Sequence, residues 1–152
     1  MKSLVYTKYG SNHLKETGVS ADAFIQIAMQ LATYRLFDNK QAATYQATQT
    51  RSFLHGRTET TRTVSTASND FVRAMNDEGS DHEHLMSLFK EATASHLRYI
   101  GKAAKGQGVD RHFFGLSQMI KNEKEQPDLF SHPLFNKSKY WRVSTSALPY
   151  TP

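Results

Sequence analysis

The chain has 152 residues, of which 38% are apolar and 11% aromatic, a composition typical of one globular domain rather than of a disordered or fibrous protein. It contains no cysteine, which excludes disulfide bonds, zinc–thiolate sites and cysteine nucleophiles. The net charge is +5 and the pI about 9.5, but the basic residues are scattered and form no Lys/Arg-rich block, so nucleic-acid binding, which would rest on the pI alone, is not expected.

The first part of the chain predicts a strand, a helix and an extended segment. Residues 3–9 carry β-branched and aromatic side chains and predict a short strand that ends at Gly10. Ser20 is a suitable N-cap, and the helix that follows it is predicted to run to about Phe37. Because apolar residues occupy most of its circumference, we expect this helix to be buried on most sides. Residues 42–66 are rich in threonine and predict a strand and a long loop.

The second part predicts three helices and a last strand. A short helix is predicted over residues 69–75, and a long one follows a capping box formed by Ser80 and Glu83. A pair of glycines ends the long helix, and Asp110 is predicted to cap the next. Residues 140–148 predict the final strand. Helices that alternate with three or four short strands predict an α/β fold, a small sheet packed with helices. No stretch approaches the roughly 18 apolar residues of a membrane-spanning helix.

Two patterns are typical of groups that bind negative charge, but neither identifies a ligand. Arg111 is predicted to lie at a helix N-terminus, where the helix dipole and a guanidinium both favour a carboxylate, although a structural salt bridge explains the residue equally well. Ser144 and Ser146 alternate along a predicted strand and therefore share one face, where their hydroxyls could donate to an oxyanion.

The histidines predict no site of their own. His82 and His84 are two residues apart on a predicted helix, so their side chains point in different directions and no metal site is expected. His96 lies on the apolar face of the long helix and is predicted to be a hydrogen-bonded core residue.

Five segments, in this order and at this spacing, resemble the carnitine/choline acyltransferase family over nearly the whole chain. They are ADAFIQIAMQLATYRL (21–36), ATYQATQTRSFLHGRTETTR (43–62), FVRAM (71–75), GQGVDRHFFGL (106–116) and WRVSTSALP (141–149). The resemblance implies an enzyme that moves an acyl group between coenzyme A and the hydroxyl of carnitine. It also implies a partial CoA-dependent acyltransferase fold of the chloramphenicol acetyltransferase type, a small mixed sheet packed with helices.

The resemblance implies that residues 1–152 are part of the C-terminal domain of such an enzyme. The N-terminal half, which carries the general-base histidine, and the last strands would lie outside this chain. None of the histidines present is therefore expected to be catalytic, namely His13, His55, His82, His84, His96, His112 and His132. The resemblance further implies no metal and no cofactor, since the coenzyme A thioester is a substrate, and a location in the mitochondrion or the peroxisome.

The resemblance also assigns the carnitine side of the site. Tyr45 and Thr58 match hydroxyl donors to the carnitine carboxylate, and Arg111 matches their charged partner. The set is physically reasonable, because a carboxylate is costly to remove from water unless an ionised donor and hydroxyls replace its hydration. Choline has no carboxylate, so Thr58 and Arg111 favour carnitine as the substrate. Ser144 matches a residue that lines the carnitine side, and Ser146 matches one that stabilises the tetrahedral intermediate.

For coenzyme A, the resemblance implies that Lys15 neutralises the 3′-phosphate and that the segment up to Asp22, including Ser20, lies along the nucleotide. Two positions depart from the family pattern: Ser11 stands where a second lysine is frequent, and Ala47 replaces a serine near carnitine. An alternative from another class stays open, namely a stand-alone module that binds coenzyme A or another anion without catalysis.

Overall fold

The computed structural model describes residues 2–122 and 126–147. The described elements follow one another as α1 (Ser11–Glu16), α2 (Ala21–Leu36), β1 (Thr44–Gln49), β2 (Thr58–Arg62), α3 (Thr66–Ala74), α4 (His82–Ala104), α5 (Val109–Gln118), α6 (Asp128–Ser131), α7 (Pro133–Ser138) and β3 (Val143–Thr145). The predicted α/β fold with a small sheet and surrounding helices is confirmed. No helix within the described ranges has the length and apolar character needed to cross a membrane.

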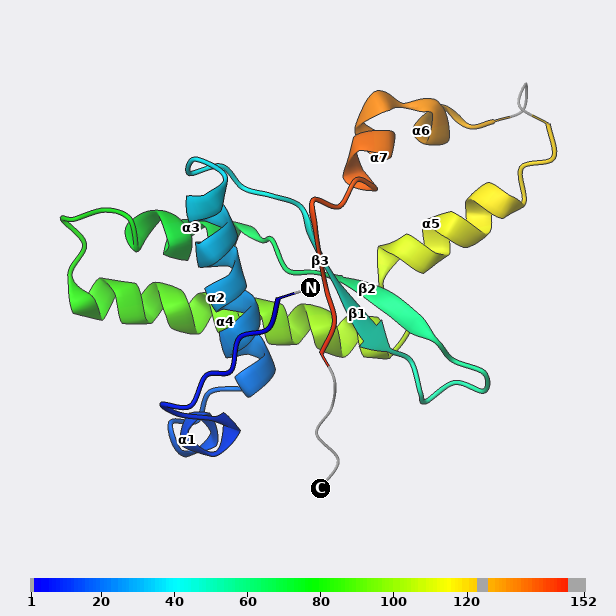
Figure 1. Ribbon diagram of the computed structural model, residues 1–152. Coiled ribbons are helices and arrows are strands. Elements are labelled where there is room, and N and C mark those ends of the chain that lie inside the picture. Colours follow the sequence, from blue (N-terminus) through cyan, green and yellow to red (C-terminus); the bar gives the residue numbers. More distant parts are fainter. Residues whose placement is uncertain (1, 123–125, 148–152) are drawn as a thin grey trace.

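The sheet is mixed, with strand order β2-β1-β3. β1 runs antiparallel to β2 with Tyr45 opposite Arg62, and parallel to β3 with Tyr45 opposite Ser144. α2 crosses the long α4, and in the view of Figure 1 α5, α6 and α7 lie to the right of the strands, with α1, α2 and α3 to the left. Because alternate residues of a strand point to opposite faces, this register places Tyr45, Thr58 and Ser144 on one face of the sheet.

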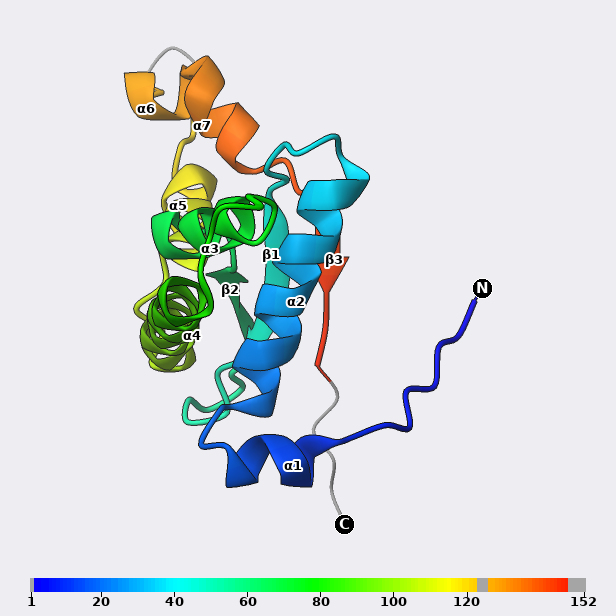
Figure 2. The same ribbon diagram turned by 90° about the vertical axis from the view of Figure 1, so that its left-hand side faces the viewer.

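The apolar core lies where α2, α3 and α4 meet (Figure 2). Its buried centre is formed by Ile27, Phe71, Val72 and Ala92. The ring of Phe71 lies 5.5 Å from that of Phe89, which extends the cluster along α4. The three helices therefore hold one another mainly by burying apolar side chains.

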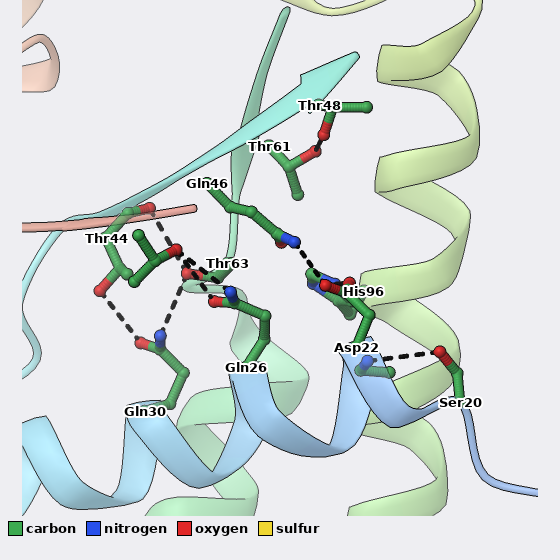
Figure 3. Close-up of polar contacts among 12 residues, drawn as sticks. Ser20, Asp22, Gln26, Gln30, Thr44, Gln46, Thr48, Thr61, Thr63 and His96 are labelled. Atoms are coloured by element: carbon green, nitrogen blue, oxygen red, sulfur yellow. Dashed lines mark hydrogen bonds and ion pairs between the residues drawn. The ribbon is translucent and has the colours of Figure 1, made fainter. Parts of the chain in front are cut away.

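The contact between α2 and the sheet is polar instead. Gln30, which is fully buried, donates to Thr63 Oγ1 at 3.0 Å and accepts from Thr44 Oγ1 at 3.4 Å (Figure 3). Gln26 donates to Thr145 Oγ1 at 3.1 Å. Buried amides and hydroxyls are tolerated when they bond to one another, and these pairs meet that condition. The threonine-rich strands thus make a polar layer on the face that α2 covers.

Two predicted features of the first part of the chain are wrong. Residues 3–9 form no strand, and among the described residues no other strand lies beside them to share backbone hydrogen bonds. α2 has the predicted bounds, and the Ser20 hydroxyl accepts from Ala23 N at 3.4 Å as expected of its cap. However, the helix is not buried on most sides, because Ile25 is 48% and Leu36 73% exposed.

Two predicted caps are also wrong. α4 is capped by Asp81, whose carboxylate accepts from His84 N at 2.8 Å, rather than by Ser80. Gly108 is the N-cap residue of α5, and Asp110 lies in its first turn. The last strand is shorter than predicted and covers Val143–Thr145; residue 148 of the prediction lies outside the described residues.

Candidate functional site

The N-terminus of α5 is held by a carboxylate from β2. The N-cap residue Gly108 has no side chain with which to cap the helix, and Glu59, only 2% exposed, takes that role. Its two carboxylate oxygens each lie 3.3 Å from the backbone N–H of Arg111, which donates to them. A Cβ atom at Gly108 would lie 2.4 Å from Glu59 Cγ, so the close approach requires glycine there. The buried negative charge lies at the positive end of the helix dipole, where it is stabilised.

Arg62 provides a second connection between β2 and α5. Its Nη2 and Nε donate to the two carboxylate oxygens of Asp110 at 2.7 and 3.1 Å, a bidentate ion pair. Its Nη1 donates to the carbonyl oxygen of Ser138 at 3.1 Å, and its Cζ lies 4.7 Å from the centre of the Trp141 ring. Asp110 therefore pairs with Arg62 instead of capping the helix as the sequence predicted.

Tyr99 of α4 belongs to the same charged group. Partial burial raises the pKa of its phenol, and the nearby carboxylates of Asp110 and Glu59 raise it further, against the opposing effect of Arg62. The phenol therefore stays protonated at neutral pH and adds no negative charge beside the two carboxylates.

Arg111 contacts β2 through both its backbone and its side chain. Its Nε donates to the carbonyl oxygen of Thr58 at 2.9 Å, and both residues line an open pocket of about 270 Å³, the Arg111 pocket, together with Thr50, Phe53, Glu59 and Gly106. Among the described residues Arg111 forms no ion pair, so the salt-bridge explanation for it is not supported, and its two Nη groups have no hydrogen-bond partner there.

Tyr45 does not line the Arg111 pocket. Thr58 pairs with Gln49 at the other end of β1, four residues from Tyr45, a separation of about 13 Å along the strand. The Tyr45 ring instead lies 5.8 Å from that of Trp141. The structure therefore brings Thr58 and Arg111 together and leaves Tyr45 apart on the same face of the sheet, so a three-residue carboxylate site stays a prediction.

Strand alternation places only one of the two serines, because β3 ends at Thr145. Thr145 donates to the carbonyl oxygen of Tyr45 at 2.9 Å and accepts from Gln26 on the α2 side, which sends Ser144 to the opposite face. Ser146 follows the strand, so the predicted shared face of Ser144 and Ser146 is not confirmed. Ser144 is exposed opposite Tyr45. Ser146, also exposed, lines an open pocket of about 570 Å³, the Ser146 pocket, together with Ser11, Asp22, Gln46, Ala47 and others.

The three residues assigned to coenzyme A do not share one pocket. Lys15 is exposed on α1. Ser20 lines a different pocket, also of about 570 Å³, which lies between α1, α2 and α4. Asp22 lines the Ser146 pocket, and its carboxylate accepts from Gln46 at 2.7 Å and lies 3.0 Å from His96 Nε2. The binding roles of these residues stay predictions.

The predicted positions of three histidines, one in the core and two on the surface, agree with the structure. His96 is 4% exposed, so it belongs to the core, and its Nε2 is hydrogen-bonded to the carboxylate of Asp22. His82 and His84 are exposed at the start of α4. Within residues 2–122 and 126–147, no three His, Asp or Glu side chains are grouped so that they could hold a metal ion.

Sequence reasoning missed Glu59, Arg62 and Gln46. One signal pointed to Glu59: a helix that begins after a glycine lacks its own capping side chain and needs an acceptor from elsewhere. For Arg62 and Gln46 the sequence offers no comparable signal, because their partners lie 48 and 24 residues away in the chain.

The sequence model of the family described as "Choline/Carnitine o-acyltransferase" matches residues 1–152. The chain is 45% identical to the mitochondrial carnitine O-acetyltransferase of Saccharomyces cerevisiae over 94% of its own length and 21% of that protein. It is 40% identical to the liver isoform of human carnitine O-palmitoyltransferase 1 over 97% of its length and 18% of that protein. It is 36% identical to the peroxisomal carnitine O-octanoyltransferase of Bos taurus over 88% of its own length and 22% of that protein. The chain thus spans about a fifth of the length of these relatives.

Proposed function

The chain belongs to the choline/carnitine O-acyltransferase family, and we propose that it is a segment of a carnitine O-acyltransferase that contributes binding of carnitine and coenzyme A. In this proposal residues 1–152 are part of a C-terminal domain with the chloramphenicol acetyltransferase type of fold. The general-base histidine and the last strands belong to the rest of the same enzyme. The yeast and bovine relatives are named for the mitochondrion and the peroxisome, and we propose one of these organelles for the enzyme.

The observation that supports carnitine as the acceptor is the placement of Arg111. Its Nε is bonded to β2 at Thr58, while its Nη groups have no partner among the described residues beside the Arg111 pocket. A guanidinium held in this way can offer a pair of N–H groups to a carboxylate, and the Thr58 hydroxyl can donate beside it. Carnitine carries such a carboxylate and choline does not.

The reaction that we propose for the whole enzyme is direct transfer. A histidine outside this chain removes the proton from the carnitine hydroxyl, and the oxygen attacks the thioester carbonyl of acyl-CoA. Ser146 and the trimethylammonium group of carnitine stabilise the oxyanion of the tetrahedral intermediate. Its collapse breaks the carbon–sulfur bond, and the coenzyme A thiolate takes the proton back from the histidine. Lys15 supports coenzyme A by neutralising its 3′-phosphate, and Ser144 lines the carnitine side.

The 152-residue chain alone is expected to show no acetyl transfer from acetyl-CoA to L-carnitine. His96 is buried against Asp22, and none of the other histidines has a context that suits a general base. The measurement is the release of free coenzyme A thiol, with the protein from the complete reading frame as the positive control. Robust turnover by the purified chain would contradict the proposal that the general-base histidine lies outside it.

A second candidate is a stand-alone module that binds coenzyme A or another anion. It is favoured by Arg111, whose Nη groups beside the Arg111 pocket have no hydrogen-bond partner among the described residues and can bind any carboxylate or phosphate. The flanking reading frame decides between the two: a continuous frame that encodes a histidine-bearing half supports the enzyme, and closing stop codons support the module.

A further inference from the structure

The carboxylate of Asp22 is held by side chains from two other elements. His96 of α4 has its Nε2 3.0 Å from Asp22 Oδ2, and Gln46 of β1 donates from its Nε2 to Oδ1 at 2.7 Å (Figure 3). Because an ionised carboxylate only accepts hydrogen bonds, the imidazole donates through Nε2–H. Each oxygen of Asp22 thus has its own donor, and the orientation of the carboxylate is fixed by groups of the helix and the strand that face it.

These two partners are buried, while the carboxylate reaches the surface. His96 is 4% and Gln46 1% exposed, whereas the side chain of Asp22 is 30% exposed. Asp22 lines the Ser146 pocket. A carboxylate has about four acceptor positions, of which the two donors occupy two, so acceptor positions remain for N–H or O–H groups of a ligand.

The two partners also lack full hydrogen bonding. Within the described residues, neither Gln46 Oε1 nor His96 Nδ1 has a hydrogen-bond partner, although both atoms are buried. A buried unpaired polar atom costs free energy, so each of the two residues carries an unfavourable contribution to stability beside its bond to Asp22. Departures of this kind are expected where side chains serve a site rather than the fold.

We propose that His96 and Gln46 are positioning residues that hold the Asp22 carboxylate toward the Ser146 pocket and thereby set the affinity for coenzyme A. This rests on the proposed function, in which Asp22 lies in the coenzyme A site. His96 and Gln46 act through Asp22 and make no contact with the ligand themselves. Loss of either donor frees the carboxylate to turn and leaves its charge without a buried partner.

The test is calorimetric titration of the proposed full-length enzyme with coenzyme A, together with the thermal unfolding midpoint of each variant. His96→Leu and Gln46→Leu are expected to weaken coenzyme A binding about tenfold or more, because each removes one charge-assisted hydrogen bond. His96→Gln is expected to retain most of the affinity, since its amide N–H can replace Nε2–H. Asp22→Asn, which preserves shape and hence folding, is expected to weaken binding as well.

Gln30→Leu is the matched control, because Gln30 is equally buried in the same polar layer and bonds to Thr44 and Thr63 rather than to Asp22. It is expected to lower the unfolding midpoint and leave the coenzyme A Kd unchanged. The inference is overturned if folded His96→Leu, Gln46→Leu or Asp22→Asn binds as tightly as the original chain, or if Gln30→Leu weakens binding equally. A full-length enzyme that folds and does not bind coenzyme A contradicts the proposed function itself.

Discussion

Replacing Arg111 by alanine in the proposed full-length enzyme is expected to raise the KM for carnitine about 10- to 100-fold and to leave the KM for acyl-CoA nearly unchanged. The guanidinium lies beside Thr58 at the Arg111 pocket, which shares no lining residue with the Ser146 pocket that Asp22 lines. Removing it leaves the carnitine carboxylate without its charged donor, and desolvation of that carboxylate is then poorly compensated. Steady-state kinetics with each substrate varied in turn measures both constants.

Arg98→Ala is the matched control, because Arg98 is an exposed cation of α4 whose ion pair with Glu91 lies on the surface. It should change neither KM. Arg111→Lys should give an intermediate carnitine KM, since the ammonium keeps the charge but cannot offer two parallel N–H groups. Equal effects of Arg111→Ala on both substrates would refute the assigned role.

Replacing Phe71 by alanine is expected to lower the free energy of unfolding by about 3–5 kcal/mol. Phe71 is 8% exposed, lies in the cluster of Ile27, Val72 and Ala92, and contacts the ring of Phe89. This cluster is small, and the α2–sheet contact is made of hydrogen bonds, so little other apolar burial compensates for the cavity. Urea unfolding followed by circular dichroism measures the change.

The control for this substitution is Phe114→Ala on α5, where the ring is 58% exposed. It removes the same atoms from the surface and should cost less than about 1 kcal/mol. Similar losses for the two variants would mean that the cluster between α2, α3 and α4 is not the main source of stability.

Local sequence signals predicted the elements that depend on local physics. Ser20 was identified as the cap of α2 because a serine hydroxyl accepts from an N–H three residues later, a contact within one turn. His96 was placed in the core because its position falls on the apolar face of α4. Alternation along β3 correctly separated Thr145 from Ser144, whereas Ser146 follows the strand and is not placed by it.

The features that the sequence could not predict depend on distant contacts. Residues 3–9 have strand-like composition, but a strand needs a neighbour, and composition does not reveal its absence. The apolar residues Ile25 and Leu36 are exposed because the described chain covers only one side of α2. The role of Glu59 as an acceptor for α5 depends on a contact across 52 residues.

In the candidate site, too, the sequence predicted residues but not the distant contacts between them. The resemblance named Thr58 and Arg111 without their geometry, and the structure brings them together through the Nε contact to the Thr58 carbonyl. Tyr45 shares their sheet face at the other end of β1, because the register of β1 and β2 separates it from Thr58. Strand register of this kind is fixed by pairing and packing, which local sequence patterns do not specify.

The most direct test of the carboxylate contact compares the affinities of carnitine and choline for the full-length protein and for its Arg111→Ala variant. In the original protein, choline, which lacks the carboxylate, should bind about 10-fold or more weakly than carnitine. In the variant this difference should shrink to the part that the Thr58 hydroxyl supplies. If the substitution weakens carnitine and choline by the same factor, Arg111 does not bind the carboxylate and the account is wrong.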